Sequence, residues 1–133
     1  MPCFFDTNVL VYAFGKDEKA AIAQNLLNAG GHIAVQSLNE FTRVKIGKHR
    51  WPWSDVHDAL AGIITLCPLP VTMDFALHRR GIDLAKRYKF HVFDAMIVAA
   101  AITADCDTLH SEDMHHGLVV DGQLRIVNPF TAG

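Results

Sequence analysis

The chain has 133 residues, of which 50% are hydrophobic and 20% are charged, with a formal net charge of −2. This composition predicts a packed hydrophobic core and excludes a disordered or collagen-like chain. The small net charge argues against a protein that binds nucleic acid through a large excess of basic residues. The longest unbroken apolar run covers residues 95–102, which is too short to cross a bilayer because that takes about 20 residues.

The N-terminal residues and the cysteines indicate the cellular compartment. Residues 1–9 place Asp6 directly after a short apolar run and contain no basic stretch, unlike a secretory signal peptide. The 3 cysteines are odd in number and form no CxxC pair, which favours reduced thiols over disulfides or a zinc site. We therefore predict one soluble, cytoplasmic domain over residues 1–133.

Helices and strands are predicted to alternate along the chain. Apolar periodicity, capping residues and Gly or Pro stops mark the helices, and short runs of apolar residues between turn signals mark the strands. In chain order we expect strand 3–5, helix 18–28, strand 32–36, helix 37–48, helix 54–66, strand 69–71, helix 72–88, helix 93–104, strand 106–110 and strand 124–127. This alternation predicts an α/β fold with a mainly parallel sheet.

Acidic residues occur at the points where functional sites form in parallel α/β sheets, just beyond the carboxyl ends of strands. Asp6 follows the first strand, Glu40 lies one turn into the helix after the second, Asp94 opens a buried helix and Asp113 follows a later strand. Taken singly, each has a structural interpretation. Asp6 and Asp94 fit helix caps, Ser37 and Glu40 fit a capping box, and Asp113 fits a turn.

Taken together, these four acids favour a metal site. Converging carboxylates repel one another unless a divalent cation compensates them. Mg²⁺ and Mn²⁺ prefer such oxygen ligands. A bound ion of this kind activates water and stabilises the charge on a phosphodiester, so the pattern points to phosphodiester hydrolysis.

Four segments around these acids carry motifs. They are a hydrophobic strand with Asp-x-Asn and an apolar run at 4–12, a Glu-bearing segment at 37–41, an aromatic-Asp-Ala helix start at 93–101, and a Ser-x-Asp after a strand at 109–113. Together with Gly117 and the ending at residues 126–130, this ordered set resembles PIN-domain ribonucleases of the VapC toxin type. The resemblance extends from residue 4 to residue 130.

The resemblance implies a three-layer α/β/α PIN-like fold with an acidic pocket for Mg²⁺ or Mn²⁺. In this pocket Asp6, Asp94 and Asp113 are expected to bind the metal directly or through water. Glu40 is expected to complete the pocket and to orient the attacking water.

The same resemblance assigns supporting residues. Asn8 and Ser111 are expected to hold Asp6 and the metal-bound waters by hydrogen bonds. Glu112 is adjacent to Asp113, and either residue fits the role of the fourth acid. The spacing from Ser111 favours Asp113.

The implied activity is that of a metal-dependent endoribonuclease, the toxin of a type II toxin–antitoxin system. The implied partners are an RNA substrate, a cognate VapB-like antitoxin and a second copy of the chain. Ile63, Ile64 and Leu66 are apolar enough to form a dimer surface, although burial in the core explains them equally well. Two other functions stay open: a non-catalytic RNA-binding PIN-like module, and another Mg²⁺-dependent phosphohydrolase or DNA nuclease.

Two basic runs flank the acids, at residues 43–50 and 79–89. They fit phosphate docking beside an acidic pocket and fit solvated helix faces with i,i+4 ion pairs equally well. Trp51 and Trp53 lie on either side of Pro52. We expect both to anchor a helix entry by packing rather than to stack on bases.

Overall fold

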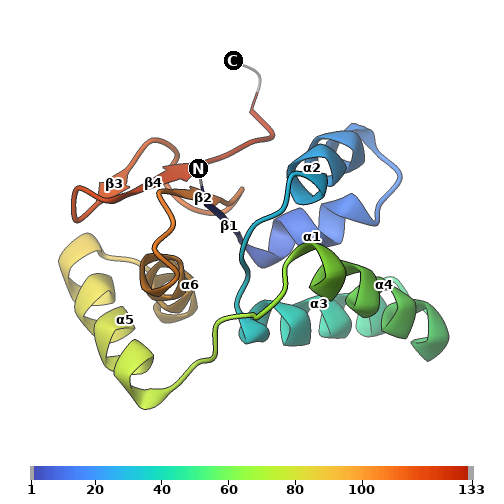
Figure 1. The fold of residues 1–133 in the computed structure, drawn as a ribbon, viewed down its shortest axis with the longest axis horizontal. Coiled ribbons are helices and arrows are strands. Elements are labelled where there is room, and N and C mark those ends of the chain that lie inside the picture. Colours follow the sequence, from blue (N-terminus) through green and yellow to red (C-terminus); the bar gives the residue numbers. More distant parts are fainter. Residues whose placement is uncertain (1, 132–133) are drawn as a thin grey trace.

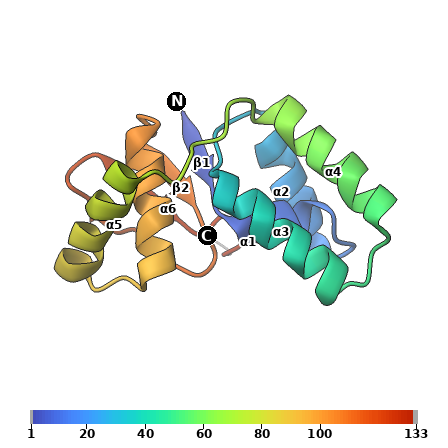
Figure 2. The same cartoon turned by 90° about the horizontal axis from the view of Figure 1, so that it is seen from below.

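The computed structural model describes residues 2–131 (Figure 1). Its elements are β1 (Cys3–Phe5), α1 (Thr7–Ala13), α2 (Glu18–Asn28), α3 (Val35–Gly47), α4 (Trp53–Leu66), α5 (Phe75–Tyr88), α6 (Val92–Thr103), β2 (Thr108–His110), β3 (Val119–Val120) and β4 (Leu124–Val127). Helices α5 and α6 lie on one side of the strands and α1 to α4 on the other (Figures 1 and 2). This arrangement confirms the predicted three-layer α/β/α fold.

The sheet has the strand order β1-β2-β4-β3. Strand β1 pairs parallel with β2, and β2 pairs parallel with β4, whereas β3 pairs antiparallel with β4. In this register Phe5 lies beside His110, and His110 lies beside Val127. The three parallel strands therefore end level with one another, and the residues that follow β1 and β2 emerge at the same edge.

Successive residues of β1 face opposite sides of the sheet, as the pleat of a strand requires. Phe4 packs into one hydrophobic core with α5, α6 and Leu109. Phe5 packs into a second core with α1 to α4, where Phe41 is also fully buried. The two cores explain why β1 is apolar on both of its faces.

The chain enters α3 earlier than predicted. The expected strand over residues 32–36 is reduced to isolated bridges at His32 and Ala34. Ala34 occupies the N-cap position, because the Val35 amide already donates to the Val71 carbonyl at 2.9 Å and the chain leaves the sheet there. Ser37 therefore lies buried inside α3, and the predicted capping box with Glu40 is wrong.

Other helix starts also differ from the prediction. Helix α4 begins at Trp53 behind Pro52 rather than at Ser54, since proline lacks an N–H and suits a helix start. Asp74, not Thr72, caps α5 by accepting a hydrogen bond from the Leu77 amide at 2.8 Å.

The two tryptophans have different environments. Trp51 packs edge-on against Phe14 with ring centroids 6.2 Å apart, as predicted for a packing anchor. Trp53 is 67% exposed, so the same prediction is wrong for it. Ile63 is only 1% exposed and belongs to the core, which removes it from the suggested dimer surface, whereas Ile64 is 37% exposed. No helix within residues 2–131 is long and apolar enough to span a membrane.

Candidate active site

Asp6 is placed at the carboxyl edge of the sheet by the end of β1. Its backbone amide donates to the His110 carbonyl at 3.0 Å, which continues the β1–β2 pairing by one residue. One carboxylate oxygen accepts from the Thr7 amide at 2.8 Å and caps α1, as predicted. The other accepts from the Ser111 hydroxyl at 2.7 Å. The carboxylate is thus rigidly held, and the predicted support from Ser111 is present as a direct hydrogen bond.

The surroundings of Asp6 disfavour its charged form. Burial, helped by the nearby Asp94 and Asp113, raises its pKa to about 6, although the hydrogen bonds from Ser111 and Thr7 act to lower it. None of the ion pairs among residues 2–131 involves this carboxylate. Asp6 is therefore a buried acid without a basic partner, the condition under which a bound cation stabilises a site most.

Asp94 lies in the first turn of α6, not at its N-cap, which is His91. Burial raises the pKa of this half-buried carboxyl, His91 lowers it, and Asp113 and Glu40 raise it. Asp94 therefore lies close enough to Asp113 and Glu40 for their charges to act on it. His91 is exposed and lies close enough to Asp94 for its charge to act on that carboxyl.

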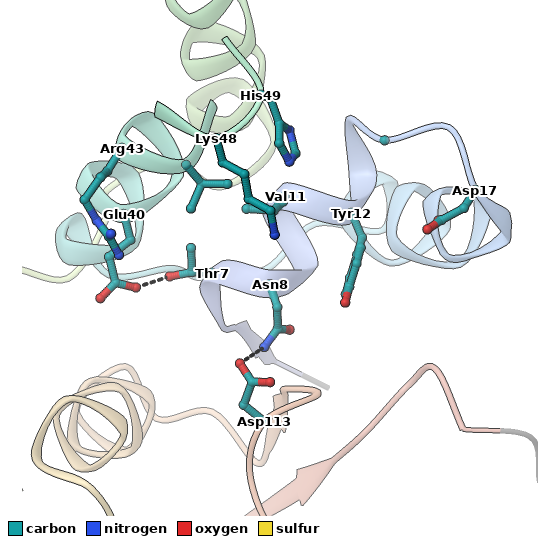
Figure 3. Close-up of a pocket in the computed structure, with 12 residues that line it drawn as sticks. Thr7, Asn8, Val11, Tyr12, Asp17, Glu40, Arg43, Lys48, His49 and Asp113 are labelled. Carbon is teal, nitrogen blue, oxygen red and sulfur yellow. Dashed lines mark hydrogen bonds between the residues drawn. The ribbon is translucent and has the colours of Figure 1, made fainter. Parts of the chain in front are cut away.

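Glu40 and Asp113 are held by the first residues of α1 (Figure 3). Thr7 donates its hydroxyl hydrogen to Glu40 at 2.7 Å, and the Asn8 side-chain amide donates to Asp113 at 3.2 Å. Asn8 was expected to hold Asp6. Instead, its side-chain oxygen accepts a hydrogen bond from the Glu112 backbone amide at 3.2 Å. The role of Thr7 was not predicted, and its place between Asp6 and Asn8 is the sequence signal that points to it.

Glu112 is bound by residues of α1 and α2. Its carboxylate accepts hydrogen bonds from the Tyr12 hydroxyl and, at 2.6 Å, from the Lys19 ammonium. The Lys19 ammonium also lies 4.7 Å from the centre of the Tyr12 ring. We call this group, which joins α1 and α2 to the segment after β2, the Glu112 brace. Because Glu112 is occupied in this way, the geometry favours Asp113 as the fourth acid.

A hollow of about 510 Å³, which we call the α1–α3 hollow, lies beside these residues (Figure 3). Glu40 and Asp113 contribute acids to its wall, whereas Arg43, Lys48 and His49 contribute basic groups. A second hollow of about 230 Å³ is lined by Asp94 and again by Asp113. Asp113 therefore lines both hollows.

The acids offer the oxygen ligands that Mg²⁺ and Mn²⁺ prefer. Within residues 2–131, no three His, Cys, Asp or Glu side chains are grouped tightly enough to be recognised as a ready metal site. Three of the four acids are held by hydroxyl or amide groups: Asp6 by Ser111 and Thr7, Glu40 by Thr7, and Asp113 by Asn8. The donor set fits a divalent cation in chemistry and charge, because the acids influence one another and none of them forms an ion pair among residues 2–131.

Fold and site together define a parallel α/β/α domain with a group of carboxylates at the carboxyl edge of its sheet. The model of the PIN domain family matches residues 3–117. The chain therefore belongs to the PIN domain family.

Solved structures with the same fold include toxins. One, described as a toxin–antitoxin complex from Klebsiella pneumoniae, is similar with a TM-score of 0.72 and 20% identity, covering 98% of this chain and 99% of that chain. Another is Mycobacterium tuberculosis VapC20, described as a sarcin–ricin loop cleaving toxin, with a TM-score of 0.67 and 14% identity over 84% of this chain and 89% of that chain. No curated protein matches the sequence significantly. At these identities the likeness shows a shared fold.

Proposed function

We propose that the protein is a metal-dependent endoribonuclease, the VapC-type toxin of a toxin–antitoxin pair. The observation that carries the proposal is the position of Asp6, a buried acid at the carboxyl edge of the sheet that forms no ion pair among residues 2–131 and lies near Asp94 and Asp113. Membership of the PIN domain family and the similarity to a toxin–antitoxin complex and to the toxin VapC20 support it.

The candidate ligands are the acids at the carboxyl edge of the sheet. Asp6, Asp94 and Asp113 would hold Mg²⁺ or Mn²⁺ directly or through water, and Glu40 would complete the site. When bound, such an ion supplies an activated water and stabilises the charge that develops on the phosphodiester.

The remaining chemistry comes from residues that fix these acids. Ser111 and the Thr7 amide keep the Asp6 carboxylate aimed into the site and favour its charged form. Thr7 occupies one oxygen of Glu40, while the other lies at 3.5 Å from the Gln36 amide nitrogen and has capacity to accept a hydrogen bond from water. Glu40 is thereby suited to orient an attacking water.

The proposal includes the partners and the extent of the domain. We propose RNA as substrate, a VapB-like antitoxin as inhibitor and a homodimer in the cytoplasm, with residues 1–133 as one PIN domain. A structural relative described as a toxin–antitoxin complex supports the antitoxin.

Replacing Asp6 tests the activity directly. Asp6→Asn keeps the size of the side chain but removes its charge, so we expect RNA cleavage in Mg²⁺ or Mn²⁺ to fall by about 100-fold or more. The measurement is cleavage of a panel of structured RNAs, with EDTA and single-stranded DNA as controls. Asp58→Asn, at an exposed acid on α4, is the matched variant and should cleave like the wild type.

The same experiment separates the other functions. RNA binding without cleavage by the wild type, in either metal, would favour a non-catalytic module. Cleavage of the DNA control alone would favour a DNA nuclease. Full cleavage by purified, folded Asp6→Asn protein would refute the assignment of the site.

A further inference from the structure

We propose that the α1–α3 hollow binds a nucleotide next to the scissile phosphate of an unpaired RNA strand, with Arg43, Lys48 and His49 contacting its phosphates. This inference rests on the proposed function and names how that site holds its substrate. It also decides between the two interpretations of the basic run at residues 43–50 in favour of phosphate docking.

The basic side chains of the hollow lie along α3 and its C-terminal end. In Figure 3, Arg43 lies beside Glu40 on α3, Lys48 and His49 lie at the end of that helix, and Asp113 lies across the hollow on the segment after β2. An RNA strand whose reacting phosphate lies at the acids would therefore place a neighbouring phosphate near the basic side chains. Phosphate contacts of this kind fix the register of a nucleic acid without reading its sequence.

The basic groups are available for a ligand. Arg43 and Lys48 are exposed and form no ion pair among residues 2–131. On α5, by contrast, the Arg87 guanidinium is occupied by Asp83 at 2.9 Å and Asp121 at 2.7 Å. The second basic run thus contains an ordinary surface ion pair, whereas the first presents free cations to the hollow.

His49 is oriented by a buried lysine. Lys45 is 1% exposed, and its ammonium lies 3.1 Å from Nδ1 of His49 and 4.5 Å from the centre of the Trp51 ring. An ammonium has hydrogen-bond donors only, so Nδ1 accepts and Nε2 carries the ring hydrogen. His49 thereby offers an N–H donor for a phosphate or base oxygen, and Lys45 acts as its positioning residue.

Size and charge favour an unpaired RNA strand over the other candidate, an acidic peptide. A volume of about 510 Å³ falls within the range of about 300–1,000 Å³ typical of small-ligand pockets, which suits one nucleotide and not a duplex. Proteins read RNA mainly where its bases are unpaired. The carboxylates of an acidic peptide in the hollow would be repelled by Glu40 and Asp113. Unlike RNA, such a peptide has no phosphate that a metal ion could bridge to these acids.

Steady-state kinetics at several salt concentrations test the inference. For cleavage of a single-stranded RNA by the full chain in Mg²⁺ or Mn²⁺, we expect Arg43→Ala and Lys48→Ala each to raise KM about 5-fold with kcat within about 2-fold. Each variant should also reduce the slope of log KM against log salt by about 0.7, the value for one phosphate contact on a single strand. Lys86→Ala, at an exposed lysine of α5 outside both hollows, removes the same charge and should change neither quantity.

The positioning role of Lys45 has its own readout. Nitrogen-15 NMR of the histidine rings should show His49 as the Nε2–H form in the wild type and a mixture of both tautomers in Lys45→Met. An unchanged His49 signal in folded Lys45→Met protein would contradict this role.

The same measurements distinguish a wrong nucleotide site from a wrong nuclease assignment. If the wild type cleaves RNA, Asp6→Asn does not, and Arg43→Ala and Lys48→Ala keep wild-type KM and salt slope, the nuclease stands and the nucleotide site is overturned. If an acidic decapeptide binds in a Lys48-dependent manner while the KM for RNA is unchanged in Lys48→Ala, the basic groups serve a protein partner, which also overturns it.

Discussion

Asp6 performs two tasks with one carboxylate. One oxygen caps α1, and the other accepts the Ser111 hydrogen bond while the group faces Asp94 and Asp113. A helix cap and a candidate metal ligand are therefore not competing interpretations of this residue. The cap fixes the orientation that a ligand needs, which explains why an acid directly after a strand is suited to both.

The metal-free protein should lose stability as the pH rises from about 4 to about 6. Burial, Asp94 and Asp113 raise the pKa of Asp6 from the ordinary 3.8 to about 6, so the folded chain binds this proton more tightly than the unfolded chain does. The stabilisation, of about 3 kcal/mol for a difference of this size, is present at low pH and is lost as the pH passes the folded pKa.

Urea unfolding in EDTA between about pH 4 and pH 7 measures this effect. The free energy of unfolding of the wild type minus that of Asp6→Asn should decrease over the range, because only the wild type titrates at this position. A difference that stays constant across the range would contradict the raised pKa.

At the scale of residues, sequence patterns indicated the acids but not all of their partners. The family resemblance indicated a hydrogen bond between Ser111 and Asp6, and the parallel pairing of β1 with β2 is what brings the two residues together. Asn8 holds Asp113 and Glu112 rather than Asp6, and Thr7 holds Glu40. Such contacts depend on how the first turn of α1 is rotated, which no spacing along the chain records.

At the scale of elements, apolar patterns predicted the middle of each helix better than its first and last residues. Helices α2 and α6 lie close to their expected ranges because their apolar stripes are long. Helix α3 begins earlier because the bridge between Ala34 and Val71 ends the sheet there. That bridge joins segments far apart in sequence, so local propensity misplaced the boundary.

Gly31 lies so close to β1 that a side chain at this position should lower the stability of the fold. A Cβ at this position would lie 2.5 Å from the Phe5 ring and 2.9 Å from the Cys3 carbonyl oxygen, so β1 would have to move. We expect Gly31→Ala to lower the free energy of unfolding by about 1–3 kcal/mol, as overpacking does. Urea denaturation monitored by circular dichroism is the measurement.

Gly62 in α4 provides the matched control. A Cβ there meets nothing within 4 Å, so Gly62→Ala should raise the free energy of unfolding by up to about 1 kcal/mol through helix propensity. Equal shifts in the two variants would show that the close approach at Gly31 does not constrain β1.

At the scale of the molecule, the candidate site joins two separately packed halves. Asp94 is carried by α6, which packs in the core on one side of the sheet, whereas Glu40 is carried by α3, which packs in the core on the other. The α/β class and the parallel sheet were predictable from alternating elements. The strand order and the short antiparallel β3 were not, because they depend on long-range pairing.

Expression in bacterial cells tests the proposed toxin as a whole. Without an antitoxin, the wild type should slow growth, because an unrestrained ribonuclease depletes cellular RNA. Asp94→Asn should restore growth, whereas Asp58→Asn should be as harmful as the wild type. Growth curves at matched protein levels, checked by immunoblotting, are the measurement, and equal toxicity of Asp94→Asn would indicate harm through binding rather than cleavage.

The Glu112 brace connects α2 to the edge of the sheet that carries the acids. Lys19 donates a hydrogen bond to Glu112, the residue before Asp113, although Lys19 itself lines neither hollow. Loss of this ammonium would remove one of the contacts, beside those of Tyr12 and Asn8, that hold the segment leading to Asp113. The placement of a candidate metal ligand therefore depends in part on a side chain that lines neither hollow.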